Sequence, residues 1–327
     1  MREVFGRLVM AVRWRLLGVV VGVLSSCALP GPAFSPEVLE SVVSVLPVWP
    51  GYEKRGTAQA RPGQEPEGTA VAIKPGGYLV TNLHVIARAV SVNVRLANGL
   101  LLPAEIIGSD RLTDLALLKV EKDLAVLPPG PRPALAAPVC AVGNQFGLGL
   151  SVTCGVVSAT RRSGVGFNPI EDFIQTDAVV NPGASGGALL DKEGRLVGVL
   201  SAIFTKESDA NLGVNFAASM PLVMRVVEDL IAHGRVVRGR SGLGVRDLAA
   251  EDRRRMVGAV IVKLASGGPA EAAGLQVGDV ITAIGDRPIG RASDVTSAID
   301  MYRIGERFEV TVLREGRPRT VAIQMTH

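Results

Sequence analysis

The chain has 327 residues, of which 47% are hydrophobic and 4% aromatic, and it carries a formal net charge of +4. This length predicts two domains, and the hydrophobic content is sufficient for globular cores. No basic stripe is interleaved with aromatic residues, which argues against nucleic-acid binding. No His or Cys cluster has metal-ligand spacing, so we expect neither a metal nor a cofactor.

Residues 1–27 have the pattern of a targeting segment. Four arginines precede an apolar run at 16–24, which is too short for a membrane span of about 20 residues. The following Leu-Ser-Ser-Cys resembles a bacterial lipobox, in which Cys27 would become the lipidated N-terminus. An ordinary signal peptide and an uncleaved anchor are the alternatives. We therefore expect an exported protein of the periplasm or cell envelope, tethered to the membrane.

Residues 28–66 are rich in Pro and Gly and lack periodicity, which predicts a flexible linker. Beyond it, residues 78–86 form a β-rich run that contains His84, and Asp114 stands at the head of an apolar strand. Asp110 has the same chemistry without a strand directly after it, so Asp114 is the stronger candidate for a functional acid.

Two cysteines, Cys140 and Cys154, fall on strand-like runs on either side of a glycine-rich turn. An antiparallel pair could bring them opposite each other, and an oxidising compartment would permit a disulfide. The sequence leaves this open, and we favour two buried free thiols.

The run at 181–187 reads Asn-Pro-Gly-Ala-Ser-Gly-Gly and centres on Ser185. Glycines allow tight turns and can aim N–H groups at a substrate oxygen. The Gly-x-Ser-x-Gly pattern also fits the α/β-hydrolases, which require the chain order serine, acid, histidine. However, His233 has the character of a helix C-cap at the end of 221–233, and His327 is the last residue. The remaining order is His84, Asp114, Ser185, the order of chymotrypsin-type proteases.

Four sequence runs point to a particular protease family, because they occur in the order and spacing typical of that family. The chain resembles the HtrA/Deg family of serine proteases in the runs 81–85, 113–119, 142–149 and 175–187. The resemblance implies a mainly β protein, with a chymotrypsin-like double β-barrel protease domain at 67–237. A small α+β PDZ domain would follow at 238–327.

The same resemblance implies the chemistry. His84 would act as general base, Asp114 would orient it, and Ser185 would be the nucleophile. The N–H groups of Gly183 and Ser185 would form the oxyanion hole.

The chain departs from the family pattern at two places. Ala184 replaces the usual asparagine, but this residue mainly supplies backbone, so we expect activity to survive. In the stretch 213–219, which borders the primary specificity pocket in the family, Asn215 replaces a glycine and Ser219 lacks a preceding proline. Asn215 and Ala217 are the candidate pocket residues, and the small and apolar residues of this stretch still suit a small or medium apolar side chain before the scissile bond.

The C-terminal region begins with a basic run at 235–240, which is typical of a solvated linker or face. A short helix from Pro269, a strand, a second helix at 292–302 and two strands at 308–313 and 319–324 follow. In PDZ domains a Gly-Leu-Gly-Val loop captures the carboxylate of a peptide C-terminus. Here that loop corresponds to Leu243, Gly244 and Val245.

The family further implies unfolded or mislocalised proteins as substrates, C-terminal peptides as PDZ ligands, and a homotrimer. The competing interpretation is a proteolytically weak or inactive chaperone or peptide-binding module. Loss of caseinolysis in a Ser185→Ala variant would separate the two.

Overall fold

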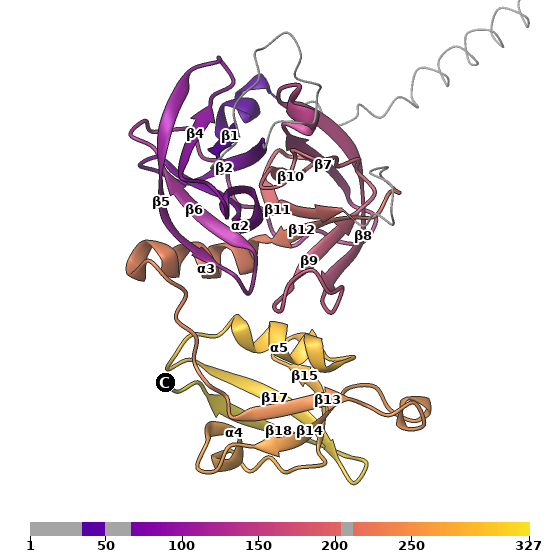
Figure 1. Ribbon diagram of the computed structural model, residues 1–327. Helices are drawn as coiled ribbons and strands as arrows, with labels where there is room; N and C mark the ends of the chain where they lie inside the picture. Colours follow the sequence, from indigo (N-terminus) through magenta and orange to yellow (C-terminus); the bar gives the residue numbers. More distant parts are fainter. Residues whose placement is uncertain (1–34, 50–66, 204–211) are drawn as a thin grey trace, which may run out of the picture. The chain divides into compact units, whose positions relative to one another are not determined.

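The computed structural model describes residues 35–49, 67–203 and 212–327. Two closed six-stranded β-barrels come first, and a smaller β-sheet domain follows them (Figure 1). The expected mainly β class with a double barrel is thus confirmed. The predicted signal or anchor segment, with Cys27, lies outside the described residues.

The first barrel closes in the order β1-β2-β3-β6-β5-β4. Its strands are β1 (Val42–Val48), β2 (Gly68–Lys74), β3 (Tyr78–Asn82), β4 (Ser91–Arg95), β5 (Leu101–Asp110) and β6 (Leu115–Lys119). A short helix, η1 (Pro36–Ser41), precedes β1. Alternate apolar side chains of these strands fill the barrel, with Val43, Leu79 and Leu118 inaccessible to solvent.

Strand β1 corrects the sequence-based domain map. Residues 36–48 belong to the segment predicted as a flexible linker, and that prediction is wrong for this part. Val42, Val43 and Val45 are completely buried, and β1 pairs with both β2 and β4. The barrel cannot close without this strand, because it supplies the edge that joins β2 to β4.

The second barrel closes in the order β10-β11-β12-β9-β8-β7. Its strands are β7 (Pro138–Gly143), β8 (Ser151–Arg162), β9 (Phe173–Thr176), β10 (Ala188–Asp191), β11 (Leu196–Ile203) and β12 (Asn215–Ser219). A single turn of 3-10 helix, η2 (Gln145–Gly147), lies between β7 and β8. Ala184, Leu189 and Ala217 are among its buried core residues.

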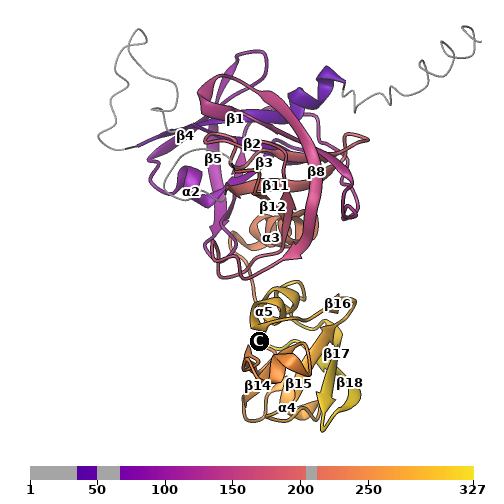
Figure 2. The same cartoon turned by 90° about the vertical axis from the view of Figure 1, so that its right-hand side faces the viewer.

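Helix α3 (Met220–His233) packs against β5 and β6 of the first barrel and β11 and β12 of the second (Figure 2). Gly234 adopts φ +67 after the helix, and its N–H donates to Leu230 O at 2.9 Å, as in a left-handed C-cap. The predicted helix at 221–233 is confirmed, and His233 lies exposed in its last turn.

The C-terminal domain is a six-stranded antiparallel sheet in the order β13-β14-β15-β17-β18, with β16 paired to β15. The strands are β13 (Leu243–Asp247), β14 (Ala259–Leu264), β15 (Val280–Ile284), β16 (Arg287–Pro288), β17 (Arg307–Arg314) and β18 (Arg317–Gln324). Its helices are η3 (Asp252–Arg254), α4 (Pro269–Ala272) and α5 (Ala292–Asp300). The helices and strands predicted here are confirmed, with α5 ending two residues earlier than expected.

Candidate active site

The acid–base pair lies at one end of the first barrel. His84 Nδ1 lies 2.5 Å from Asp114 Oδ2, and the His84 backbone N–H donates to Asp114 Oδ1 at 2.9 Å. The two side chains are 50% and 17% exposed, so the imidazole can be reached from solvent while the carboxylate is largely covered. This arrangement fixes both the position and the ring orientation of the imidazole.

The backbone around the pair departs from the predicted strand. His84 was expected near the end of a β-run, but it lies in the one-turn helix α2 (Leu83–Ile86). Strand β3 ends at Asn82, opposite Leu115, and the Leu83 N–H donates to Asp114 O at 2.9 Å at the next position of the same register. Asp114 has φ +58, a left-handed conformation that aspartate tolerates better than most residues.

Ser185 lies in the loop between β9 and β10 of the second barrel. The loop requires two glycines with positive φ, Gly183 at +95 and Gly186 at +84. A Cβ at Gly183 would lie 2.3 Å from Asn144 O, and one at Gly186 would lie 2.0 Å from Thr69 O. Side chains are therefore excluded on both sides of the serine by conformation and by space.

Strand β2 of the first barrel bonds this loop directly. The Thr69 N–H donates to Ser185 O at 2.9 Å, and Thr69 Oγ1 donates to Gly183 O at 2.7 Å. Thr81 Oγ1 donates to Thr69 O at 2.7 Å, three residues before His84. One backbone hydrogen bond and two threonine hydroxyls thus connect the serine loop to the corner that carries the imidazole. Within the described ranges, Ser185 Oγ itself forms no hydrogen bond.

The peptide between Pro182 and Gly183 is held in one orientation. The Phe146 N–H, in η2, donates to Pro182 O at 2.7 Å. Since C=O and N–H point in opposite directions across a trans peptide, the Gly183 N–H points away from Phe146. Neither this N–H nor that of Ser185 donates to an acceptor in the described part of the chain. Two N–H groups next to a serine hydroxyl are therefore free to bind an oxygen.

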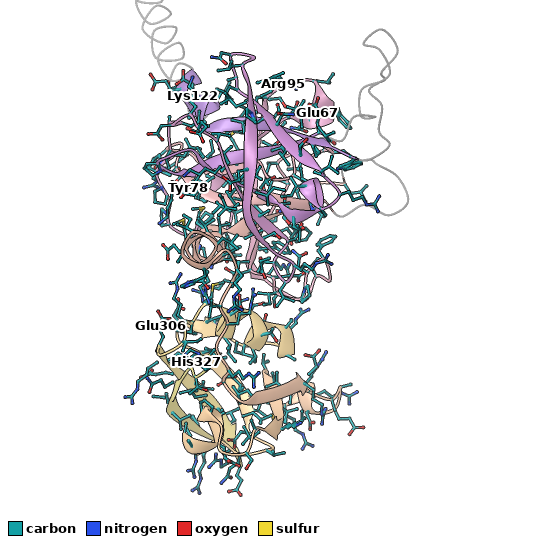
Figure 3. The ribbon with its side chains drawn as sticks, turned by 60° about the vertical axis from the view of Figure 1, so that its left-hand side comes forward. Glu67, Tyr78, Arg95, Lys122, Glu306 and His327 are labelled. Carbon is teal, nitrogen blue, oxygen red and sulfur yellow. A yellow bond between two sulfur atoms is a disulfide. The ribbon has the colours of Figure 1, made fainter. Side chains whose placement is uncertain are left out.

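A polar cluster that was not predicted from the sequence supports η2. Asn144 Nδ2 donates to Glu67 Oε2 at 2.5 Å, and Arg95 donates to the same oxygen at 2.9 Å. Glu67 and Arg95 lie beside each other in Figure 3. Asn144 Oδ1 in turn accepts from the Gly149 N–H at 2.8 Å. The side chain of Asn144 thereby ties the loop before β8 to the first barrel.

Ala184 contributes backbone, as expected from the sequence. Its side chain is fully buried in the core of the second barrel. Its N–H donates to Asn181 O at 3.1 Å, and its carbonyl accepts from the Gly187 N–H at 2.9 Å. The tight turn around Ser185 is therefore closed by main-chain bonds that do not depend on an asparagine side chain at this position.

Asn215 and Ala217, on β12, are both fully buried. Asn215 Nδ2 donates to Ala178 O at 2.8 Å and lies 3.5 Å from Thr176 O. Its amide thus crosses from β12 to the segment that runs from β9 into the serine loop. The neighbouring Ala217 pairs with Ile174 on the same strand pair.

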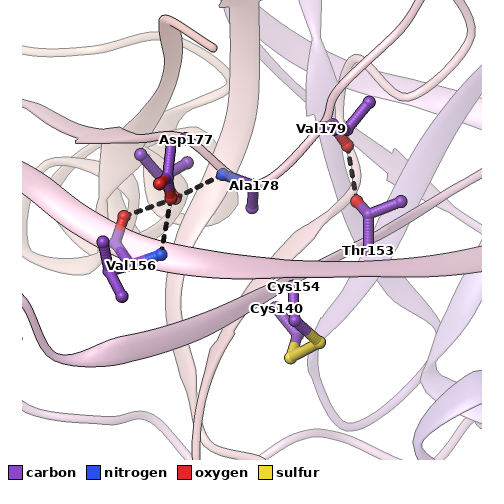
Figure 4. The surroundings of a disulfide bond; sticks show 8 residues. Cys140, Thr153, Cys154, Val156, Asp177, Ala178 and Val179 are labelled. Carbon is purple, nitrogen blue, oxygen red and sulfur yellow. Dashed lines mark hydrogen bonds between the residues drawn. A yellow bond between two sulfur atoms is a disulfide. The ribbon is translucent and has the colours of Figure 1, made fainter.

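Cys140 and Cys154 form a disulfide, so the expectation of two free thiols is wrong (Figure 4). The β7–β8 register places the two residues directly opposite each other. Cys140 is buried, whereas Cys154 is exposed. Next to the bridge, Thr153 Oγ1 donates to Val179 O at 2.5 Å and the Val156 N–H to Asp177 Oδ1 at 2.7 Å. The disulfide therefore joins β7 to β8, and β8 in turn bonds residues 177–179 at the start of the serine loop.

Leu243, Gly244 and Val245 form the start of strand β13 rather than a loop. Among the strands of the described ranges, β13 pairs only with β14 and therefore forms an edge of the sheet. A cavity of about 230 Å³ lies beside it. Apolar side chains from β13 and α5 line this cavity: Leu243, Val245, Val295 and Ile299. Arg238 and Asp300 also line the cavity. An open strand edge next to a cavity with apolar side chains is the arrangement in which a peptide adds as a further strand.

In the described ranges, no group of three or more His, Cys, Asp and Glu side chains could hold a metal ion. The helices described there include none with the length and apolar character needed to cross a bilayer.

Comparisons with known proteins agree with this geometry. Residues 68–199 match the family model of the trypsin-like peptidase domain, and residues 212–325 match that of the PDZ domain. The fold and site define a trypsin-like serine peptidase domain followed by a PDZ domain. The serine endoprotease DegS of Escherichia coli (strain K12) is 35% identical over 269 residues, which are 78% of this chain and 75% of DegS. The chain belongs to the HtrA/Deg family of serine proteases.

Further relatives differ in how much of their length is matched. A solved structure of the HtrA-type protease AlgW with a tripeptide has a TM-score of 0.68 and 34% identity, covering 88% of this chain and 94% of AlgW. A probable periplasmic serine endoprotease, DegP-like, of Chlamydia muridarum (strain MoPn / Nigg) is 37% identical over 82% of this chain. The chain spans 56% of that relative and 61% of the DegP-like protein of Ectopseudomonas mendocina (strain ymp).

Proposed function

We propose that the chain is a serine endopeptidase that cleaves unfolded or mislocalised envelope proteins through an acyl-enzyme. The observation that carries this proposal is the pair of hydrogen bonds between His84 and the Asp114 carboxylate in the first barrel. The Ser185 loop is hydrogen-bonded to the same barrel through Thr69. Membership of the HtrA/Deg family, whose relatives here are named serine endoproteases, supports it.

The mechanism follows from the roles of these groups. Ser185 Oγ attacks the scissile carbonyl carbon while His84 Nε2 takes the hydroxyl proton. Asp114 stabilises the resulting imidazolium, and the N–H groups of Gly183 and Ser185 bind the oxyanion. The C–N bond then breaks, and His84 returns the proton to the leaving amine. Water, activated by the same imidazole, hydrolyses the Ser185 ester and restores the enzyme.

The test compares casein hydrolysis by the parent chain and by Ser185→Ala, together with labelling by a fluorophosphonate probe. The parent should hydrolyse casein and take up one label per chain, and the variant should do neither. Equal hydrolysis by both would show that Ser185 is not the nucleophile. A parent that neither hydrolyses casein nor takes up the label would instead favour the inactive chaperone or peptide-binding alternative.

We propose that Asn215 and Ala217 shape the primary specificity pocket. Asn215 bridges β12 to the backbone at Ala178, and Ala217 adds no bulk beyond a methyl group. The site should therefore accept small or medium apolar side chains before the scissile bond. Mapping of casein fragments by mass spectrometry checks this, and predominant cleavage after aromatic or charged residues would contradict it.

The C-terminal domain is proposed to bind peptide C-termini along β13, with Leu243, Gly244 and Val245 at the carboxylate end. Its open edge and the apolar side chains in the adjacent cavity support this. Fluorescence anisotropy on the Ser185→Ala chain, which cannot cleave the probe, should show binding of a peptide with an apolar free C-terminus. Equal affinity for the C-terminally amidated peptide would exclude carboxylate capture. If this domain regulates cleavage, truncation at Arg240 should abolish the response to such peptides.

Location and assembly are also proposals. The DegP-like relatives are named periplasmic, which supports the periplasm for this chain. Lipidation at Cys27 would tether it to the membrane, and loss of fatty-acid labelling in Cys27→Ser tests that. A homotrimer is expected by analogy with the family, and a light-scattering mass of one chain would contradict it.

A further inference from the structure

Arg238 departs from the behaviour predicted for its basic run. Residues 235–240 were expected to be solvated, but the Arg238 side chain is only 23% exposed. Its Nη1 and Nη2 donate to the two oxygens of Asp110 at 2.9 and 2.7 Å, and its Nε donates to Asp300 Oδ1 at 2.5 Å. One guanidinium from the interdomain linker thus joins the end of β5 to the end of α5. The expectation of a solvated side chain is wrong for Arg238.

Asp110 connects this guanidinium to the turn that carries Asp114. Asp110 and Leu115 pair across β5 and β6, so they close the turn at 111–114. Thr113 Oγ1, from inside the turn, donates to Asp110 Oδ2 at 2.6 Å. Asp110 and Thr113 are 7% and 1% exposed, so this bond lies in the protein interior.

A buried carboxylate needs a cation to remain charged. Burial raises the pKa of the Asp110 carboxyl, but hydrogen bonds from Arg238 and Thr113 outweigh it and hold the pKa below its usual range. Arg238 therefore allows Asp110 to stay ionised and to accept from Arg238 and Thr113 together. Without the arginine, the same carboxylate would be a buried, uncompensated charge beside the turn.

Asp114 O accepts from the Leu83 N–H at 2.9 Å and from Asn82 Nδ2 at 3.1 Å, and the preceding residues of the turn have their own anchors. The Ile170 N–H donates to Leu112 O at 2.9 Å, and Asn168 Nδ2 donates to Thr113 O at a longer 3.3 Å. Asp114 follows Thr113 directly and holds φ +58, which the turn must maintain. A loosened Thr113 would therefore move the carboxylate that orients His84.

We propose that Arg238 is a positioning residue for the reaction: through Asp110 and Thr113 it holds the turn that aims Asp114 at His84. This inference rests on the proposed function of the His84–Asp114 pair. Arg238 contacts no catalytic side chain itself, so its effect should fall on kcat and leave KM almost unchanged. Asp300 shares the guanidinium, which ties the C-terminal domain to the same turn.

The test uses the whole chain and a double-mutant cycle. Arg238→Met and Asp110→Asn should each lower kcat per active site by about 10- to 100-fold, the range that a small misplacement of catalytic groups can produce. The double variant should have a kcat no lower than that of the more affected single variant, because both changes remove the same Arg238–Asp110 interaction. Arg235→Met, at an exposed arginine of the same run, is the matched control and should match the parent.

A second readout does not require proteolysis. The His84 Nδ1 proton, held against Asp114, should give a downfield imidazole resonance in proton NMR of the parent. This resonance should be lost or shifted in Arg238→Met and kept in Arg235→Met, even if the parent proved inactive on casein. Should Arg238→Met fail to fold, Arg238→Lys, which keeps a cation without the bidentate contact, should show the same losses. Unchanged kcat with an unchanged resonance, or additive effects in the cycle, would overturn the proposal.

Discussion

The acid turn of the first barrel and the serine loop of the second are held in different ways. Asp114 is bonded to Leu83, Asn82 and His84, all within its own barrel. The Ser185 loop instead receives bonds from Thr69 of the other barrel and from Phe146 of η2. The hydrogen bonds of Asp114 itself therefore lie within one barrel, although Ile170 and Asn168 of the second barrel bond its neighbours Leu112 and Thr113. The Ser185 loop depends directly on how the two barrels meet.

This difference separates two requirements of the chemistry. Proton transfer needs one correct ring orientation, which two bonds from Asp114 supply. Oxyanion binding needs two main-chain N–H groups aimed at one point, and it depends on peptide planes held from several sides. A change of the Asp114 side chain should therefore affect mainly the reaction, whereas a change around the serine loop should also affect stability.

The largest effect is expected for Asp114→Asn. Asparagine tolerates φ +58 and can still accept from the His84 N–H, so the turn should persist. Its Nδ2, however, would face His84 Nδ1 with a hydrogen and impose the tautomer that cannot accept the Ser185 proton. By comparison with the aspartate of other triads, kcat should fall about 10⁴-fold, measured per folded chain on casein or a peptide.

Stability serves as the control for this variant. The urea midpoint of Asp114→Asn should match that of the parent, because no bond of the serine loop is touched. A fall in kcat of less than 10-fold would mean that Asp114 does not set the imidazole tautomer. A large loss of stability would break the comparison, since it would show that the acid turn also supports the fold.

The sequence predicted the components of the acid turn better than their surroundings. The order of His84, Asp114 and Ser185 could be read because each motif is local and carries its own chemistry. Strand β1 could not be predicted from the sequence, because its apolar run is flanked by Pro- and Gly-rich segments. It acquires its role only by pairing with β2 and β4. The ion pairs of Arg238 span 128 and 62 residues, and nothing near 235–240 announces them.

The disulfide near the serine loop is another feature that the sequence could not predict. Two strands and a turn were predicted around Cys140 and Cys154, but pairing depends on a register that composition does not reveal. A shift of one residue would place the two sulfur atoms on opposite faces. The observed register, with Cys140 opposite Cys154, decides between the two alternatives that the sequence left open.

Removal of this disulfide is expected to have the next largest effect. The bridge closes a loop with a sequence separation of 14, for which chain entropy predicts about 3 kcal/mol of stabilisation. Cys140→Ala/Cys154→Ala should lower the free energy of unfolding by about that amount in urea titrations. The His84–Asp114 pair lies in the other barrel, so kcat per folded chain should change little.

The reduced parent chain should behave like the double variant, and Cys27→Ser should behave like the oxidised parent. A loss of less than about 1 kcal/mol would show that the β7–β8 hairpin is held by its ladder alone. A loss of kcat in the folded fraction would show that the hairpin also controls the serine loop through Thr153 and Val156.

Thr69→Val is the smallest change and bears most directly on the comparison. Thr69 Oγ1 donates to Gly183 O at 2.7 Å and accepts from the Asn144 N–H at 2.9 Å. Valine has nearly the same shape, so it would leave two main-chain groups without their partners at a cost of about 1–3 kcal/mol in unfolding free energy. Because Gly183 carries a proposed oxyanion N–H, kcat should also fall, by up to about 10-fold. Thr69→Ser keeps the hydroxyl and should restore both quantities. If Thr69→Val matched the parent in both, the serine loop would not depend on its hydrogen bonds to Thr69 of the first barrel.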